Sequence, residues 1–285
     1  MDFLPGPLPG VTPKTILTIA GSDSSGGAGL QADLRTISLL GMHACTAVTA
    51  VTTQNTQGVL QSYPIPAAVV ADQIRAVTED IEISVAKTGM LANADTVIAV
   101  AELWASQQTK IPLVVDPVCS SMHGDQLLDD DGLKALRSVL FPHATIITPN
   151  AYEASMLTGI AVNNEQSLME AAHRLLSYGS QWVLVKGGHV PTENDSIDFL
   201  TNGTTAHRLV IPRVQTTNDH GSGDTLAAAL AVGLAYGMEM PEAVMFAKLW
   251  TVRCLGCSYP LGHGNGPVSP LWRLNAPLVN QTPPA

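Results

Sequence analysis

Short apolar runs alternate with helix-patterned segments over most of the chain, and this alternation is the feature that most constrains the fold. The apolar runs predict strands at residues 15–20, 47–53, 83–88, 111–116, 144–148 and 182–186. Helical spacing is found at residues 28–40, 67–80, 94–107, 130–140, 151–178, 222–236 and 241–256. Alternation of this kind predicts an α/β fold in which a mainly parallel sheet carries helices on both faces.

The remaining segments predict the edge of the sheet and the two ends of the domain. Residues 196–201 and 206–212 alternate polar and apolar positions, which suits antiparallel edge strands. Residues 1–13 hold four prolines and two glycines, so we expect a flexible N-terminal arm there and a flexible tail over 276–285. Nothing between them resembles a linker, and we predict a single domain over 14–275.

Composition narrows the class of protein. Hydrophobic residues make up 46% of the chain and charged residues 13%, which allows a large core. The net charge of -10 and the lack of a basic stripe argue against nucleic-acid binding. We find no signal-peptide pattern and no apolar run long enough to span a membrane. The CLGC segment at 254–257 lacks a second cysteine or histidine pair, so we expect reduced core thiols. These features predict a cytoplasmic protein without a membrane partner.

Ligands of such sheets bind beyond the carboxyl ends of the strands, so the residues that follow each apolar run matter most. The first run leads into AGSDSSGGAG (20–29), which lacks the spacing of known nucleotide-binding loops and by itself suits a plain flexible turn. The second leads into TTQNTQG (52–58), where Gln54 could pair with an amine and a ring nitrogen at once. An ordinary polar loop explains that segment equally well.

Acidic side chains follow two neighbouring strands. Asp116 ends one apolar run and Glu153 comes shortly after another, and two such carboxylates can hold Mg²⁺ through water. Glu153 also fits an ordinary acid in the first turn of a helix. Lys186 stands at the end of a further strand.

The segment NDHGSGDT (218–225) opens an Ala/Leu-rich helix. Its backbone N–H groups and the positive end of that helix predict a nest for an anion such as a phosphoryl group. Asp224, at the same helix start, is placed to take a proton from an attacking hydroxyl. Alone, Asp224 fits a first-turn acid better, but the other strand-end groups together favour catalysis.

These segments, in this order, resemble the ribokinase-like superfamily, and within it the hydroxymethylpyrimidine/phosphomethylpyrimidine kinases of thiamine biosynthesis. The resemblance covers nearly all of 15–268. It is densest in the glycine-rich start through TTQNTQGV, then in AKTGML, VVDPV, ITPNAYEA, LVKGGH, HGSGDTLAAALA and GHGNGPV. It implies a ribokinase-like three-layer sandwich, a homodimer, and use of ATP and Mg²⁺, and it leaves a monovalent cation open. The implied reaction phosphorylates 4-amino-5-hydroxymethyl-2-methylpyrimidine, and then its monophosphate to the pyrophosphate.

The resemblance also implies roles for individual residues. The pyrimidine pocket would consist of Gly21, Ala28, Asp33, Gln54, Met90 and Val118. Asp33 and Gln54 would bind the aminopyrimidine edge, and Met90 would pack on the ring. The phosphate side would consist of Asp116 and Glu153 for Mg²⁺, Lys186 and Asn150 for ATP, and Gly221, Ser222 and Gly223 for the anion hole, with Asp224 as the base.

Two departures from the family pattern bear on the acceptor. Asp224 stands where members often carry cysteine, and CSSMHG (119–124) replaces a segment like MVAKSG, so its lysine is missing or replaced by His123. The nearest alternative is a pyridoxine/pyridoxal kinase or an enzyme of dual specificity. A non-catalytic sensor is a further alternative, which the presence of Asp224, Asp116, Glu153 and Lys186 makes unfavourable.

Overall fold

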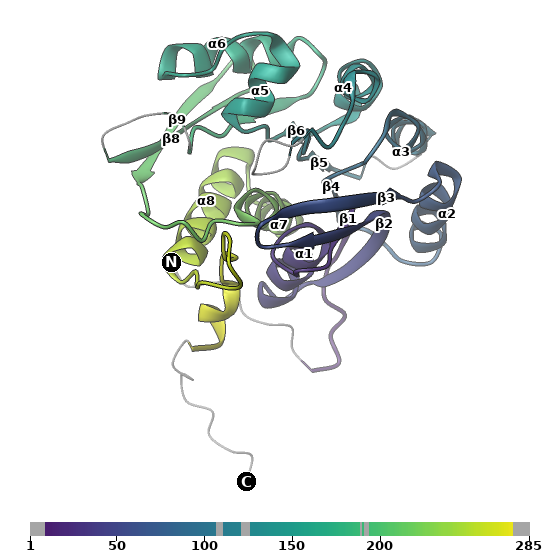
Figure 1. The fold of residues 1–285 in the computed structure, drawn as a ribbon. Helices are drawn as coiled ribbons and strands as arrows, with labels where there is room; N and C mark the ends of the chain where they lie inside the picture. Colours follow the sequence, from purple (N-terminus) through teal and green to yellow (C-terminus); the bar gives the residue numbers. More distant parts are fainter. Residues whose placement is uncertain (1–8, 107–110, 121–125, 189, 191–193, 276–285) are drawn as a thin grey trace.

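The computed structural model describes residues 9–106, 111–120, 126–188, 190 and 194–275, and a nine-stranded sheet forms its centre (Figure 1). The strand order is β3-β2-β1-β4-β5-β6-β7-β8-β9. The strands are β1 (Thr15–Asp23), β2 (His43–Asn55), β3 (Gly58–Pro64), β4 (Val85–Thr88), β5 (Leu113–Val115), β6 (Ile146–Ile147), β7 (Trp182–Val185), β8 (Asp195–Thr201) and β9 (Ala206–Pro212). From β2 to β7 all neighbours pair in parallel, which confirms the predicted mainly parallel sheet.

Helices cover both faces of this sheet (Figure 1). They are α1 (Gly29–Leu39), α2 (Ala67–Thr78), α3 (Ala94–Ser106), α4 (Asp130–Ala135), α5 (Ala151–Thr158), α6 (Glu165–Leu176), α7 (Ser222–Ala235) and α8 (Met240–Gly256). Helices α1, α7 and α8 pack on one face, and α2 to α6 on the other. Successive strand residues serve opposite cores: Ile16 packs with α7 and α8, whereas Leu17 faces the other layer. That alternation explains why an inner strand such as β5 is apolar at every position.

The structure differs from the sequence prediction in some elements. The polar segment predicted at 52–58 is partly strand, because β2 runs on to Asn55 and turns into β3, an exposed edge strand that the sequence analysis missed. The helix predicted over 130–140 is α-helical only to Ala135 and continues as a π-helix over Leu136–Leu140. Of the two predicted edge strands, only β9 lies at an edge, since β8 pairs with β7 as well.

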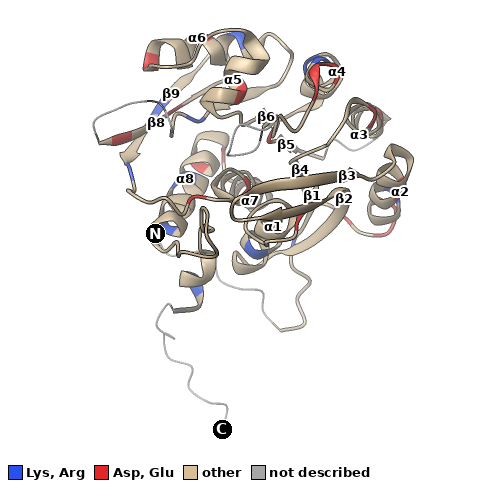
Figure 2. Cartoon of the chain, viewed as in Figure 1, with Lys and Arg blue, Asp and Glu red and all other residues tan. Residues whose placement is uncertain are grey.

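The two chain ends, the distribution of charged residues and one cysteine bear on the remaining predictions. The predicted arm and tail stay predictions, because residues 1–8 and 276–285 lie outside the described part. A 3₁₀ turn, Pro270–Asn275, ends the described chain. Within the described ranges no helix has the length and apolar character needed to cross a bilayer. Figure 2 shows Lys and Arg spread over separate elements of the part that is described. Cys257 is exposed, so the prediction of four core thiols is wrong for that residue.

Candidate active site

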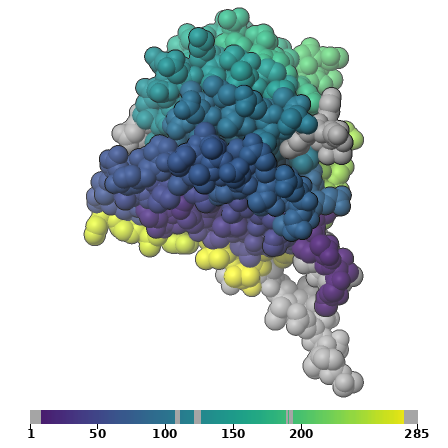
Figure 3. All heavy atoms as spheres, turned by 90° about the vertical axis from the view of Figure 1, so that its right-hand side faces the viewer, coloured from purple at the N-terminus to yellow at the C-terminus, as the bar shows by residue number. Residues whose placement is uncertain are grey.

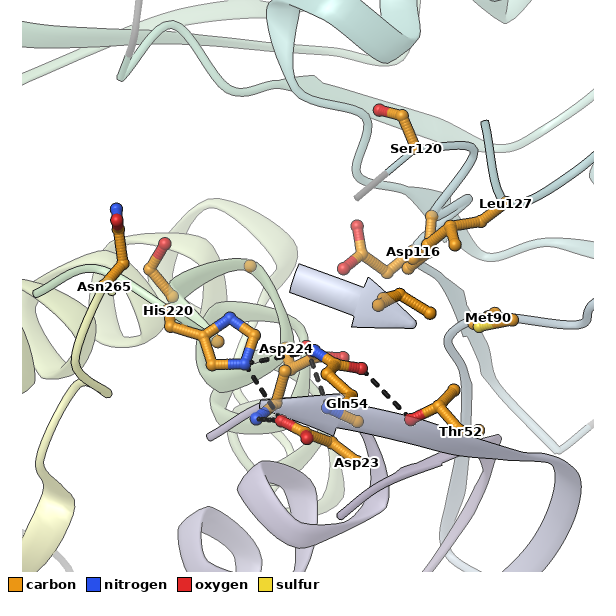
Figure 4. Close-up of a pocket in the computed structure, with 18 of the residues that line it drawn as sticks. Asp23, Thr52, Gln54, Met90, Asp116, Ser120, Leu127, His220, Asp224 and Asn265 are labelled. Atoms are coloured by element: carbon orange, nitrogen blue, oxygen red, sulfur yellow. Dashed lines mark hydrogen bonds and ion pairs between the residues drawn. The ribbon is translucent and has the colours of Figure 1, made fainter. Parts of the chain in front are cut away.

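A cavity of about 700 Å³ lies beyond the carboxyl ends of the parallel strands (Figure 4). The residues predicted from sequence that line it are Gly21, Ala28, Gln54, Met90, Asp116, Val118, Asn150, Glu153, Lys186, Gly221, Ser222, Gly223 and Asp224. They come from the ends of six parallel strands and from the start of α7, yet they meet in one cavity. This is the place where open α/β sheets bind ligands.

The glycine-rich loop after β1 and the loop before α7 touch each other backbone to backbone. Gly221 has a φ of +77°, and a Cβ at this position would lie 2.1 Å from the backbone oxygen of Gly27. A Cβ at Gly27 would lie 2.1 Å from Cδ2 of His220. Neither position has room for a side chain. Glycine in AGSDSSGGAG therefore allows the two loops to pack closely, in addition to any contact with a ligand.

Asp224 lies in the first turn of α7, and both of its carboxylate oxygens have partners. Oδ1 lies 3.1 Å from Nζ of Lys87, and Oδ2 accepts a hydrogen bond from the backbone N–H of Gly29 at 3.1 Å. Burial opposes ionisation, but Lys87 and these hydrogen bonds outweigh it and hold the pKa of Asp224 below its ordinary value. The site thus presents an ionised carboxylate to the cavity.

The anion hole predicted at Gly221–Gly223 is available only in part. The backbone N–H of Ser222 donates to the backbone oxygen of Asp219 at 3.1 Å. The N–H groups of Gly223 and Asp224 lie in the first helical turn, where no carbonyl of the same helix can accept from them. An anion at this end of α7 would therefore be held mainly by those N–H groups and by the positive end of the helix.

The position of Asp33 contradicts the prediction that this residue lines the pyrimidine pocket. Its side chain is fully buried and does not line the cavity. Its oxygens lie 2.9 and 3.0 Å from Nζ of Lys87, and Thr18 Oγ1 donates to one of them at 2.5 Å. The α1 turn on which Asp33 sits points it into the interface between helix and sheet. The resemblance implied that Asp33 binds the aminopyrimidine edge, but from this buried position its side chain cannot reach the cavity.

A polar group that the sequence analysis missed lies beside Gln54. The Asp23 carboxylate accepts backbone hydrogen bonds from Gly27 and Ala28 at 3.0 and 2.8 Å, and it lies 2.9 Å from Nε2 of His220. Burial would raise the pKa of Asp23, but His220 and these bonds lower it. A carboxylate can only accept, so His220 donates to it. Nε2 of Gln54 lies 3.3 Å from the same His220 nitrogen.

This arrangement leaves Gln54 able to face a ligand. Thr52 Oγ1 lies 3.1 Å from the amide oxygen of Gln54, and both side chains line the cavity (Figure 4). The run SDSSGG could have indicated Asp23, because an aspartate before serine and glycine often bonds the backbone that follows it. No local pattern pairs it with His220, which is 197 residues away.

Asp116, which is buried, and Lys186, which is partly buried, form an ion pair on the opposite wall of the cavity. Nζ of Lys186 lies 2.9 Å from Oδ1 of Asp116, which also accepts from Thr148 at 3.0 Å. Burial would lower the pKa of Lys186, but Asp116 and Glu153 outweigh it and raise that pKa. A Cβ on Gly223 would lie 3.3 Å from the Lys186 ammonium. The ammonium thus reaches the N-terminus of α7, where an anion would bind.

Glu153 and Asn150 cap α5 together. The Asn150 side chain accepts from the backbone N–H of Glu153, and the Glu153 side chain accepts from that of Asn150, both at 2.9 Å. Burial and Asp116 raise the pKa of Glu153 to about 7. Glu153 is therefore an acid in the first turn of a helix, as one of its two interpretations predicted, and it also lines the cavity.

These acids suit a water-mediated Mg²⁺ better than a direct one. The oxygens of Glu153 already accept the backbone N–H groups of Asn150 and Cys119, the latter at 3.3 Å. Across the described ranges, no group of three or more His, Cys, Asp or Glu side chains forms a metal cage. Mg²⁺ commonly uses one or two carboxylates and keeps several waters, so Asp116 and Glu153 fit this ion.

The remaining wall is apolar. A Cβ at Gly21 would lie 3.4 Å from the Met90 sulfur, so these two residues bound the same end of the cavity. Val118 adopts a φ of +34°, a strained backbone for a β-branched residue and one that is typical of functional sites. Of the CSSMHG segment, 121–124 and with them His123 lie outside the described residues.

Several known proteins are similar to this chain over most of its length. The family model for phosphomethylpyrimidine kinase matches residues 23–269. A hydroxymethylpyrimidine/phosphomethylpyrimidine kinase of Mycobacterium leprae is 55% identical over 277 residues, which cover 96% of this chain and 99% of that protein.

Among solved structures, an ADP complex of Bacillus subtilis pyridoxal kinase matches with a TM-score of 0.84 at 35% identity, over 93% of this chain and 100% of that one. A phosphomethylpyrimidine kinase of Clostridium difficile matches with a TM-score of 0.74 at 37% identity, over 84% and 98%. These likenesses confirm the ribokinase-like fold and the predicted resemblance. The chain belongs to the phosphomethylpyrimidine kinase family.

Proposed function

We propose that the protein transfers a phosphoryl group from ATP to the hydroxymethyl group of 4-amino-5-hydroxymethyl-2-methylpyrimidine, and then phosphorylates the monophosphate to the pyrophosphate. The observation that carries this proposal is the position of Asp224. It is an ionised carboxylate at the N-terminus of α7, and it shares one cavity with the ring-binding candidate Gln54 and the cation Lys186.

The groups divide the reaction between them. Asp224 takes the proton as the O–H bond of the substrate breaks and the oxygen forms a bond to the γ-phosphorus. The bond from phosphorus to the bridging oxygen of ADP breaks on the opposite side. The N–H groups of Gly223 and Asp224 stabilise the charge on the transferred group, and Lys186 neutralises the phosphate chain. Gln54 offers an amide donor and acceptor to the edge of the ring.

The cofactor proposal rests on the acids of the opposite wall. Asp116 and Glu153 would hold Mg²⁺ through water, and the ion would neutralise charge on the ATP phosphates. Asn150 lies at the start of α5 and lines the same cavity, which suits contact with ATP. We infer no monovalent-cation site, because no described residue distinguishes one.

Pyridoxal is the second candidate acceptor. One similar structure is that of a pyridoxal kinase, whose substrate is also a hydroxymethyl heteroaromatic ring. Asp224, in place of the cysteine often found there, touches the acceptor and could alter the choice between the two rings. The higher identity to the pyrimidine kinases, at 55%, favours the pyrimidine.

Substitution of Asp224 tests the base. We expect Asp224→Asn to lower kcat by about 10²- to 10⁴-fold, the usual contribution of a general base, while calorimetry still detects pyrimidine binding. Asp95→Asn is the matched control, because Asp95 is also a first-turn helix acid, in α3. Similar small effects of both substitutions would mean that Asp224 is only a helix acid and that the proposed mechanism is wrong.

We further propose a homodimer formed through the face that carries β3 and α2, which is turned to the viewer in Figure 3. Large apolar side chains are exposed there, among them Leu60 at 74%, Tyr63 at 56% and Val69 at 47%. Exposed apolar patches of this kind commonly mark subunit contacts. Sedimentation should give a dimer for the wild type and a monomer for Leu60→Glu with Tyr63→Glu. A monomeric wild type would contradict the proposal.

A further inference from the structure

A lysine that the mechanism above does not use lies directly behind the base. Lys87, near the end of β4, is fully buried, and its ammonium lies 2.9 and 3.0 Å from the two oxygens of Asp33. The same nitrogen lies 3.1 Å from Oδ1 of Asp224. Asp224, whose side chain is 15% exposed, is the member of this group that meets the cavity.

The buried ammonium must stay charged. Burial alone would lower the pKa of Lys87, but Asp33 and Asp224 outweigh it and raise that pKa above its ordinary value. An unpaired charge at such a depth costs several kcal/mol, whereas a well-bonded ion pair offsets most of that cost. Lys87 therefore supplies a fixed positive charge, shared between the carboxylates of α1 and α7.

The two carboxylates experience this charge differently. Burial and the neighbouring Asp224 raise the pKa of Asp33 to about 6, although Lys87 opposes this. Lys87 and Gly29 instead keep the pKa of Asp224 below its ordinary value. A proton taken up by the pair therefore goes to Asp33 first, and Asp224 stays available as a base.

Other charged groups surround Asp224 but do not replace Lys87. His220 in the loop before α7, Asp116 beyond β5 and Lys186 beyond β7 act on this cluster through space. Among the described side chains, Lys87 is the one charged group that donates a hydrogen bond to the carboxylate of Asp224. It also fixes the direction of Oδ1, while Gly29 fixes that of Oδ2.

We propose that Lys87 is a positioning residue that keeps Asp224 in its carboxylate form and oriented toward the substrate hydroxyl, and that Asp33 moderates this effect by sharing the ammonium. This inference rests on the proposed role of Asp224 as the base. Without Asp33, the whole charge of Lys87 would act on Asp224, and the carboxylate would become a weaker proton acceptor. The buried Asp33 thus has a role in the reaction without contact with the pyrimidine.

The test compares Lys87→Gln, Asp33→Asn and the double variant by measuring kcat against pH at saturating ATP and Mg²⁺. We expect Lys87→Gln to move the acid limb upward by about 1–3 pH units, the usual effect of losing an opposite charge in contact with a carboxylate. Activity should recover as the pH is raised. Asp33→Asn should show no such shift, with kcat about two- to tenfold lower because the base is weaker.

The double variant covers the case in which Lys87→Gln does not fold. It removes one charge of each sign, and we expect an upward shift of the acid limb that is smaller than in Lys87→Gln. An acid limb that stays in place in every folded variant would overturn the inference. So would an upward shift caused by Asp33→Asn, or a rise in the pyrimidine KM with Asp33→Asn as the main effect, since that would place Asp33 on the substrate.

A readout without turnover separates this inference from the proposed function. In protein labelled with ¹³C at the aspartate carboxyl carbons, Asp224→Asn assigns the Asp224 signal. That signal should titrate below its ordinary range in the wild type and at higher pH in Lys87→Gln. A wild type that phosphorylates no pyrimidine would refute the proposed function and leave this titration valid. An Asp224 signal that is unchanged by Lys87→Gln would refute the inference alone.

Discussion

Replacing Gly221 by alanine should damage the site far more than it strains the backbone. The φ of +77° at this position costs an alanine about 1–2 kcal/mol. In addition, the new methyl group would lie 2.1 Å from the backbone oxygen of Gly27, well inside an ordinary contact. Since that neighbour is backbone, the two loops would have to separate by about 1 Å to reach an ordinary contact distance. A displacement of about 1 Å at a reacting site can cost 10²-fold in rate.

Gly237 provides the matched control for this substitution. Its φ is +86°, and a Cβ there would meet no atom within 4 Å. Gly237→Ala should therefore lose about 1–2 kcal/mol of unfolding free energy with kcat unchanged. Gly221→Ala should lose more stability and about 10²-fold in kcat. Urea unfolding and an ATP-consumption assay on both variants give the comparison. A Gly221→Ala enzyme with kcat within about threefold of the control would refute the argument that contact between the loops positions the site.

Other predictions concern buried charges and the ring-binding wall. Lys248→Met should cost about 3–5 kcal/mol in urea unfolding, because it leaves the carboxylate of Asp198, now 2.5 Å from Nζ of Lys248, buried without its cation. Adding Asp198→Asn should recover part of that loss, and strict additivity of the two substitutions would contradict the pairing. Glu153, with a folded-state pKa of about 7 against an ordinary value of 4.5, should make the metal-free protein less stable as the pH rises through that interval. Glu153→Gln should remove this pH dependence of the unfolding free energy. If the pH dependence is the same in Glu153→Gln as in the wild type, Glu153 does not have the raised pKa. His220→Ala should raise the pyrimidine KM about tenfold, with a smaller change in kcat, since it removes the donor of the Asp23 carboxylate, which holds the backbone of Gly27 and Ala28 beside the cavity. An unchanged KM would show that His220 has no part in binding the pyrimidine ring.

The layers of the fold could be predicted because the sequence repeats one pattern. Strands that are buried on both faces are mostly apolar, as in Leu113–Val115, and helical spacing between them leaves few alternative topologies. The strand β3 could not be found in this way. Its sequence GVLQSYP is largely exposed at the sheet edge, so no buried face imposes a pattern on it.

The outline of the site could be predicted for the same reason, since parallel strand ends must meet at one edge of the sheet. The partners of each side chain could not. Asp33 follows a glycine-rich loop and matches a binding pattern, but only the packing of α1 against the sheet decides that it faces Lys87. Lys87 and Asp224 are 137 residues apart, and no local signal pairs them. Buried ion pairs of this kind depend on tertiary structure alone.

The most direct test of the central claim is ATP consumption with Mg²⁺ in three separate assays, which offer the hydroxymethylpyrimidine, its monophosphate and pyridoxal. The account predicts turnover of the first two, with pyridoxal turned over more slowly or not at all. Turnover of the pyrimidine without its monophosphate would mean that the segment at 119–124 does not support the second step. Pyridoxal turned over faster than the pyrimidine would contradict the proposed function and assign Asp224 to a different acceptor.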